Sequence, residues 1–366
     1  MENRQGSLEN MVTDPSFWRG RRVLVTGHTG FKGGWLSLWL HKLGAEVHGL
    51  ALDAPTDPNL FEVAQIAGVL ASDSRVDIRD QESTDRTLKS TQPAVVFHLA
   101  AQPLVPYSYQ HPIETYWVNV LGTAHVLHAA RTSGSVVAIV VVTTDKCYAN
   151  KEWEHPYKET DELGGFDPYS NSKACTELLT SAFRSSYLNA AGIATATARA
   201  GNVIGGGDWA QDRLLPDCVR AYFAGNTLKL RFQDATRPWQ HVLEPLAGYL
   251  RLAELLQGER PDQYSEAWNF GPDASDNASV RRVVSLVSSL LGGTLNVESA
   301  PSRQHEAGLL QLDSTKTRTR LDWRPRWTFE QAVENTISWY LAWSQDQDMQ
   351  HFSLRQIEDY ERAMRT

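Results

Sequence analysis

Cysteine is scarce in this chain, and the spacing of the few thiols excludes two of their common uses. The 366 residues include only three cysteines, Cys147, Cys175 and Cys218. An odd number with no Cys-x-x-Cys pair indicates neither a disulfide framework nor a zinc site. We therefore expect no bound metal.

Long apolar runs and clusters of positive charge are also absent. No stretch approaches the ~20 apolar residues that a membrane-spanning helix needs, and the polar start MENRQGSLEN does not resemble a signal peptide. The net charge is −8 without any Lys/Arg-rich run, whereas binding to a phosphate backbone requires clustered positive charge. We expect a cytoplasmic protein that binds neither a membrane nor a nucleic acid.

The chain does contain a regular alternation of apolar runs and amphipathic stretches from residue 22 to residue 200. The runs predict strands and the stripes predict helices. Because parallel strands need helical crossovers, the alternation predicts an α/β fold with a doubly wound parallel Rossmann sheet. Strands are expected at 22–26, 46–52, 76–78, 94–99, 136–142 and 193–200, and helices at 33–43, 111–132 and 169–190.

This rhythm loosens after Gly201, where glycines, prolines and polar residues become common. The change predicts a cofactor-binding domain over 17–201, a smaller C-terminal substrate-binding lobe over 202–345 and a flexible tail over 1–16. Segments near 242–272 are expected to return to the first domain. Further helices are expected at 242–256, 280–291 and 328–345, and a strand at 268–270.

Glycines recur at every third position where the first expected strand ends and a helix begins. They allow a tight turn in which backbone N–H groups and the positive end of the helix approach a pyrophosphate. A glycine-rich turn without a ligand is the alternative, but the strand before and the helix after favour a dinucleotide site. The predicted loop consists of Gly27, His28, Thr29, Gly30, Phe31, Lys32 and Gly33.

Asp53 follows the second expected strand. A carboxylate there accepts hydrogen bonds from ribose hydroxyls and repels a 2′-phosphate, which favours NAD over NADP. Alternatively, Asp53 is a turn residue before Pro55. Other NAD contacts are expected near the carboxyl ends of the third and fourth strands, at Asp77, Ile78, Leu99, Ala100 and Ala101.

Tyr169 and Lys173 are four positions apart, on one face of an expected helix. A nearby cation stabilises a phenolate, so we expect the pKa of Tyr169 to fall toward neutrality. The tyrosinate then accepts a hydroxyl proton while a hydride leaves the same carbon for NAD. Both residues are predicted to contact NAD, and a surface pair formed by chance is the alternative.

The fifth expected strand is followed by Thr144, Asp145 and Lys146. Thr144 is expected to hydrogen-bond the hydroxyl that Tyr169 deprotonates. A simple dehydrogenase needs only the threonine, tyrosine and lysine, so the additional acid and amine indicate more than one chemical step. A strand-end salt bridge is the alternative. The predicted catalytic residues are Thr144, Asp145, Lys146, Tyr169 and Lys173.

The segments TGHTGFKG, TTDKCY and YSNSK occur in this order and resemble motifs of the extended short-chain dehydrogenase/reductase family. The resemblance covers about residues 17–345 and is strongest to the nucleoside-diphosphate-sugar 4,6-dehydratases, which carry glutamate where this chain has Lys146. That departure, with GFKG and the run RPWQH at 237–241, resembles the branch that acts on CDP-glucose. It implies tightly bound NAD and a homodimer or homotetramer.

The resemblance also implies a three-step reaction. Glucose C4 is oxidised with Tyr169 as the base, water is eliminated across C5 and C6, and the hydride returns to C6. Asp145 with a raised pKa is the expected acid of the elimination and Lys146 with a lowered pKa the expected base. The sequence leaves this division between the two residues open.

Substrate contacts are expected mainly from the smaller lobe. Guanidinium groups fit phosphate oxygens, so Arg213, Arg237 and Arg303 are candidates for binding the diphosphate. Each arginine is alternatively a solvated surface charge, and each tryptophan a core residue. The other predicted substrate residues are Gln102, Asn202, Trp209, Trp239, His241 and His305.

Two other functions stay open on the sequence alone. A nucleotide-sugar 4-epimerase, or a 4,6-dehydratase for another nucleotide sugar, would share the cofactor chemistry, but an epimerase would not need Asp145 and Lys146. A non-catalytic NAD-binding protein with this fold would not need Thr144, Tyr169 and Lys173.

Overall fold

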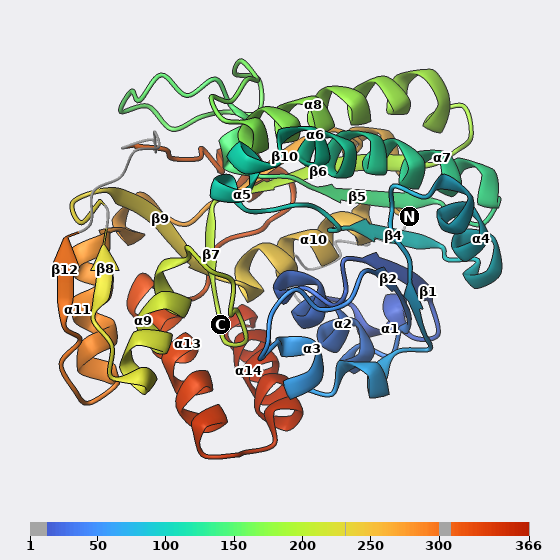
Figure 1. Ribbon diagram of the computed structural model, residues 1–366. Helices are drawn as coiled ribbons and strands as arrows, with labels where there is room; N and C mark the ends of the chain where they lie inside the picture. Colours follow the sequence, from blue (N-terminus) through green and yellow to red (C-terminus); the bar gives the residue numbers. More distant parts are fainter. Residues whose placement is uncertain (1–12, 231, 300–308, 366) are drawn as a thin grey trace, which may run out of the picture.

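A sheet of seven parallel strands forms the centre of the computed structural model, which describes residues 13–230, 232–299 and 309–365 (Figure 1). The strand order is β10-β6-β5-β4-β1-β2-β3, and each neighbouring pair is parallel. This sheet confirms the predicted doubly wound α/β fold. The strands are β1 (Arg22–Thr26), β2 (Glu46–Ala51), β3 (Ser72–Arg75), β4 (Val95–His98), β5 (Ala138–Val142), β6 (Ala194–Ala200) and β10 (Ala267–Phe270).

Helices cover both faces of this sheet, because successive residues of the central strands β1, β4 and β5 are mostly apolar and point to opposite sides. Val23 and Val25 of β1 belong to one buried cluster, and Leu24 belongs to another. Helices α2 (Phe31–Lys42) and α10 (Leu243–Leu255) lie on the first side. On the other side lie α4 (Gln81–Thr91), α6 (Pro112–Tyr116), the π-helical η2 (Trp117–Gly122), α7 (Thr123–Ser133) and α8 (Pro168–Phe183) (Figure 1).

Two segments differ from the expectation. The third strand lies at Ser72–Arg75 instead of 76–78, because Asp77 starts a turn in which its carbonyl accepts from the Asp80 N–H and its carboxylate binds Arg79. Part of the expected tail is ordered. Asp14 caps α1 (Pro15–Trp18), and its own N–H donates to Glu254.

The smaller lobe carries two short sheets. Strands β11 (Asn277–Ser279), β9 (Thr236–His241) and β7 (Asn202–Ile204) form one, and β12 (Val297–Ser299) pairs with β8 (Leu228–Leu230) in the other. Helices α9 (Leu214–Ala224), α11 (Val280–Leu290) and α13 (Phe329–Ser344) accompany them. Strand β10 joins the large sheet beside β6. The domain boundaries stay a prediction.

A last helix, α14 (Met349–Met364), lies beyond the segment for which we expected structure. It packs on α2, where the Trp39 indole and the Lys42 ammonium both donate to Glu361. The end of the chain thereby contacts the helix that follows the glycine loop.

No helix in the described residues is long and apolar enough to cross a membrane. The remaining short helices are α3 (Leu60–Val63), η1 (Ile66–Val69), α5 (Val105–Gln110), η3 (Asp145–Cys147), η4 (Arg184–Leu188), η5 (Pro261–Gln263), η6 (Ala274–Asp276) and α12 (Thr315–Arg320).

Candidate active site

In the glycine loop, the backbones of Gly27, Gly33 and Ala100 lie very close to one another. A Cβ on Gly27, which has a φ of +75°, would lie 2.8 Å from the Ala100 nitrogen, and one on Gly33 would lie 2.1 Å from the Gly27 oxygen. The Thr26 hydroxyl accepts hydrogen bonds from the N–H groups of Leu99 and Ala100, which joins the ends of β1 and β4. Since Gly30 has no side chain with which to cap α2, the first N–H groups of that helix suit a ligand phosphate. The residues present therefore fit a dinucleotide.

The residues expected at the adenosine end lie in different surroundings. The side chain of Asp53 is 94% exposed and pairs with Arg75 at 3.3 Å. His28 is buried and its Nε2 lies 2.8 Å from the Asp73 carboxylate. The Ile78 side chain is buried in the apolar core, and its contact with NAD stays a prediction. At the end of β4, Leu99, Ala100 and Ala101 are half-buried, and Asp77 is half-buried after β3.

Tyr169 and Lys173 share one face of α8, whose N-cap Asp167 accepts from the Ser170 N–H. The Lys173 ammonium donates to the Val142 carbonyl at 3.3 Å, and burial lowers its pKa to about 8. Burial raises the pKa of Tyr169 to about 12, although the Thr144 hydroxyl and the Arg213 charge oppose the rise. This direction is opposite to our expectation, because the cost of burying a phenolate exceeds the effect of the nearby charges.

Thr144, Asp145 and Lys146 form a compact turn after β5. The Thr144 hydroxyl donates to the Asp145 carboxylate at 2.9 Å and accepts from the Lys146 N–H at 3.4 Å. Asp145 is buried, and this burial raises its pKa; the charges of Lys146, Arg237 and Lys32 oppose the rise together with the Thr144 hydroxyl. A buried carboxyl of this kind suits the role of a proton donor.

Lys32 is a member of the site that the sequence did not identify as such. We expected it only as part of the cofactor loop, but its amine shares the catalytic cluster. Its pKa is lowered to about 7, mainly by burial and also by the charges of Arg213 and Lys173, while Asp145 opposes the change. The position of Lys32 between Gly30 and Gly33 was the feature of the sequence that could have indicated a catalytic role. The sequence does not reveal in which direction its side chain points.

The structure brings some of the predicted substrate residues near this cluster. Arg213 pairs with Asp208 at 2.9 Å, and this neighbour raises its pKa. Arg237 is buried in β9 and lowers the pKa of Asp145. Asn202 is half-buried at the start of β7.

Other predicted substrate residues are engaged elsewhere. Trp209 packs against Trp339, and His241 is fully buried with its ring near Trp327. The Trp239 indole donates to the Ala278 carbonyl. All three side chains are buried, and their contacts with the substrate stay a prediction. The Gln102 side chain binds within its own segment, to Thr115 and the Leu104 N–H. Arg303 and His305 lie outside the described residues, and the described part contains no group of side chains suited to a metal.

Comparisons with known proteins agree with this geometry. A protein-family model described as GDP-mannose 4,6 dehydratase matches residues 24–336. The chain is 47% identical over 355 residues to CDP-glucose 4,6-dehydratase of Salmonella typhimurium, covering 95% of this chain and 98% of that protein.

Two solved structures are also similar. A dTDP-glucose 4,6-dehydratase double mutant from Streptomyces venezuelae with NAD bound has a TM-score of 0.77, 25% identity and coverage of 90% of this chain and 99% of its own. UDP-glucose 4-epimerase of Thermus thermophilus in complex with NAD has a TM-score of 0.75 and 25% identity, with coverage of 87% and 99%. With the family match spanning most of the sequence, the chain belongs to the GDP-mannose 4,6 dehydratase family, within the short-chain dehydrogenase/reductases.

Proposed function

We propose that this chain is a lyase that converts CDP-D-glucose to CDP-4-dehydro-6-deoxy-D-glucose and water, with NAD as its cofactor. The observation that carries the proposal is the 47% identity to the Salmonella CDP-glucose 4,6-dehydratase over 95% of this chain. The buried turn of Asp145 and Lys146 beside Tyr169 and Lys173 supplies the groups for both the oxidation and the elimination. A 4-epimerase does not need an acid and an amine such as Asp145 and Lys146, so this turn favours the dehydratase over the epimerase.

The oxidation uses α8 and the end of β5. As a phenol with a pKa of about 12, Tyr169 must first lose its proton, and the positive charges of Lys173 and of bound NAD would stabilise the phenolate. The phenolate then accepts the proton of the C4 hydroxyl, and Thr144 hydrogen-bonds the same oxygen. NAD, when bound, accepts a hydride from C4 and later returns it to C6. The glycine loop and α2 hold the pyrophosphate of the cofactor. Arg213 and Arg237 bring positive charge to a diphosphate substrate in a chain whose net charge is −8.

The elimination uses the turn after β5. Once C4 is a ketone, the proton on C5 is acidic. Asp145, whose pKa is raised by burial, donates a proton to the C6 hydroxyl, which leaves as water. Lys146, as a neutral amine, accepts the C5 proton and returns a proton to C5 when the hydride adds to C6, and Lys32 places a second amine in the same cluster. This division of roles between Asp145 and Lys146 is part of the proposal.

The substrate is tested by incubating the purified protein and NAD separately with CDP-, dTDP- and GDP-glucose. We expect a product lighter by one water molecule from CDP-glucose, detected by mass spectrometry. Conversion to a C4 epimer, which leaves the mass unchanged, would support the epimerase instead. If none of the three sugars loses water, the proposed activity is rejected.

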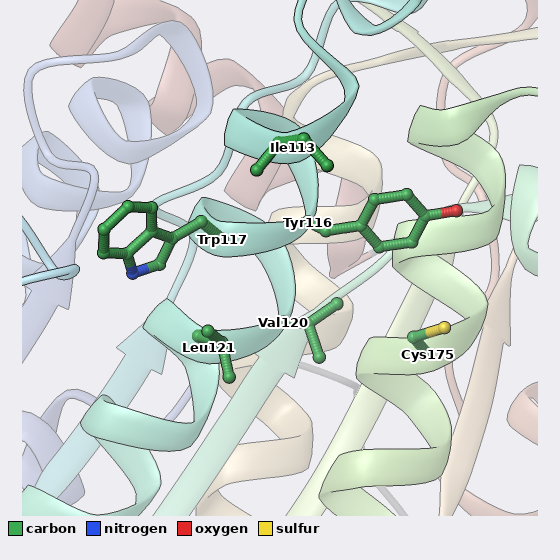
Figure 2. Close-up of a pocket in the computed structure, with 6 residues that line it drawn as sticks. All are labelled: Ile113, Tyr116, Trp117, Val120, Leu121 and Cys175. Carbon is green, nitrogen blue, oxygen red and sulfur yellow. The ribbon is translucent and has the colours of Figure 1, made fainter.

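The proposal includes assembly of two or more copies of this chain. Ile113, Trp117 and Leu121 are 77%, 48% and 52% exposed, and large exposed apolar patches mark interfaces. These side chains line a hollow, and Figure 2 shows them along α6 and η2, with Tyr116 and Val120 turned toward Cys175 of α8. Because the lining is apolar apart from one phenol and one thiol, two negatively charged copies meet there without like-charge repulsion. The hollow is lined by Ile113, Tyr116, Trp117, Val120, Leu121 and Cys175.

Replacing Leu121 with glutamate tests this interface. We expect the homodimer or homotetramer to shift to monomer in light scattering at micromolar concentration, because the change places a charge in the apolar contact. Phe223→Glu is the matched control, since Phe223 is 42% exposed on α9 in the smaller lobe. A monomeric wild type, or an unchanged assembly of the Leu121 variant, contradicts the proposed surface.

A further inference from the structure

Glu177 and Arg199 form an ion pair in the interior that the reaction steps above do not use. Glu177 belongs to α8 and Arg199 to β6. Their charged atoms are 2.9 Å apart, and each side chain is 3% exposed. Removing two charges from water is costly, and a well-packed apolar pair often stabilises a fold equally well. The position of the pair therefore suggests a role other than stability.

The Glu177 carboxylate connects the catalytic helix to the end of β5 and to the middle of β6. One oxygen accepts from the Thr143 hydroxyl, and the other accepts from the Thr197 hydroxyl at 2.7 Å and from Arg199. Thr143 directly precedes Thr144. Glu177 is also one helical turn after Lys173, on the same face of α8. The carboxylate thus joins the helix that carries the Tyr–Lys pair to the end of β5.

Arg199 connects the same carboxylate to the elimination turn. Its Nη1 donates to the Tyr148 hydroxyl at 2.8 Å, and its guanidinium carbon lies 4.9 Å from the centre of the Tyr148 ring. The Tyr148 hydroxyl donates in turn to Asn269 of β10 at 2.8 Å. Tyr148 directly follows the turn of residues 145–147. The buried Glu177–Arg199 pair therefore contacts both Thr143, which precedes Thr144, and Tyr148, which follows the turn that contains Asp145 and Lys146.

We infer that Glu177 is a positioning residue for the reaction, whose carboxylate holds the Tyr169–Lys173 helix in register with the Asp145–Lys146 turn through Thr143 and Arg199. This inference rests on the proposed function. It assigns to Glu177 no contact with substrate or cofactor. A network in which every carboxylate oxygen has a partner can fix such a register closely.

The same carboxylate has an electrostatic effect on Lys173. Burial lowers the pKa of Lys173 to about 8, while Glu177 from α8 and the Cys147 thiol from η3 raise it. Lys32 from α2 and His98 from β4 also face this amine. Removing the negative charge of Glu177 therefore lowers the pKa of Lys173. Lys173 then loses its proton at a lower pH than in the wild type.

Glu177→Gln tests the inference in the full-length protein with NAD and CDP-glucose. We expect kcat to fall roughly tenfold and the alkaline limb of kcat/KM to move to lower pH by about half a unit or more. Glu244→Gln is the matched control. Glu244 is also fully buried, but it accepts hydrogen bonds from Tyr360 and the Trp327 N–H on the side of α14. This control is expected to unfold at a lower temperature and to keep the wild-type alkaline limb.

A second variant removes the risk that an unpaired arginine unfolds the protein. Glu177→Gln with Arg199→Met deletes both charges and is expected to show the same displaced limb. An unchanged limb in either folded variant, or an equal displacement in Glu244→Gln, overturns the inference. So does failure of both Glu177 variants to fold while the control folds, since the pair is then required for folding. Absence of product from the wild type instead rejects the proposed function, before any variant is compared.

Discussion

Tyr169→Phe is expected to lower kcat on CDP-glucose by roughly 10²- to 10⁴-fold, the range for loss of a general acid–base group. The phenylalanine keeps the buried ring in place, so the fold and substrate binding are retained. Without the hydroxyl, the C4 proton has no acceptor and the first hydride transfer fails. The absorbance of reduced nicotinamide in a single turnover measures that step, and we expect no signal from the variant.

Tyr222→Phe is the control for this prediction. The Tyr222 hydroxyl donates to the Leu291 carbonyl in the smaller lobe, so the same chemical change occurs away from the site. We expect wild-type turnover from it. A Tyr169 variant that reduces bound NAD at the wild-type rate would assign the first proton transfer to another group.

Lys146→Ala is expected to separate the two halves of the reaction. The Lys146 contact to Thr144 uses the backbone N–H, so alanine preserves the turn and removes only the amine. The variant should still reduce bound NAD with CDP-glucose. Overall dehydration should fall by roughly 10²- to 10⁴-fold, and exchange of the C5 proton with deuterated water should stop. Mass spectrometry of the recovered sugar measures this exchange.

Two further lysine variants show whether the effect is specific. Lys151→Ala removes an exposed amine paired with Glu162 at 3.1 Å and should leave both steps unchanged. Lys32→Ala removes the other amine near Asp145. If Lys32→Ala stops C5 exchange while Lys146→Ala dehydrates normally, the base is Lys32 and our assignment is wrong.

Local sequence patterns were enough to predict the strand, the glycine loop and the helix that carries Tyr169 and Lys173. An apolar run followed by Gly27, Gly30 and Gly33 is typical of a strand that ends in a tight turn, and β1 begins and ends where the sequence indicates. The spacing of Tyr169 and Lys173 likewise requires only a helix. Strand ends were less certain, because the short-range turn at Asp77 competes with extension of β3.

The missing parts of the prediction depend on tertiary packing. The sequence gives no direction for the Lys32 side chain, whose charge interacts with that of Asp145 only in the folded chain. Burial also decided the pKa of Tyr169, against the expected effect of its neighbouring lysine. The burial of Trp209 and His241 likewise depends on side chains that are distant in the sequence, Trp339 and Trp327.

Intramolecular transfer of the hydride from C4 to C6 of the same sugar, by way of the bound cofactor, is the central claim. It is tested most directly with CDP-glucose deuterated at C4, mixed with unlabelled CDP-glucose. The account predicts product with deuterium at C6 in the labelled molecules and no crossover to the unlabelled ones, measured by NMR and mass spectrometry. Deuterium lost to solvent, or retained at C4 of an epimer, would contradict it.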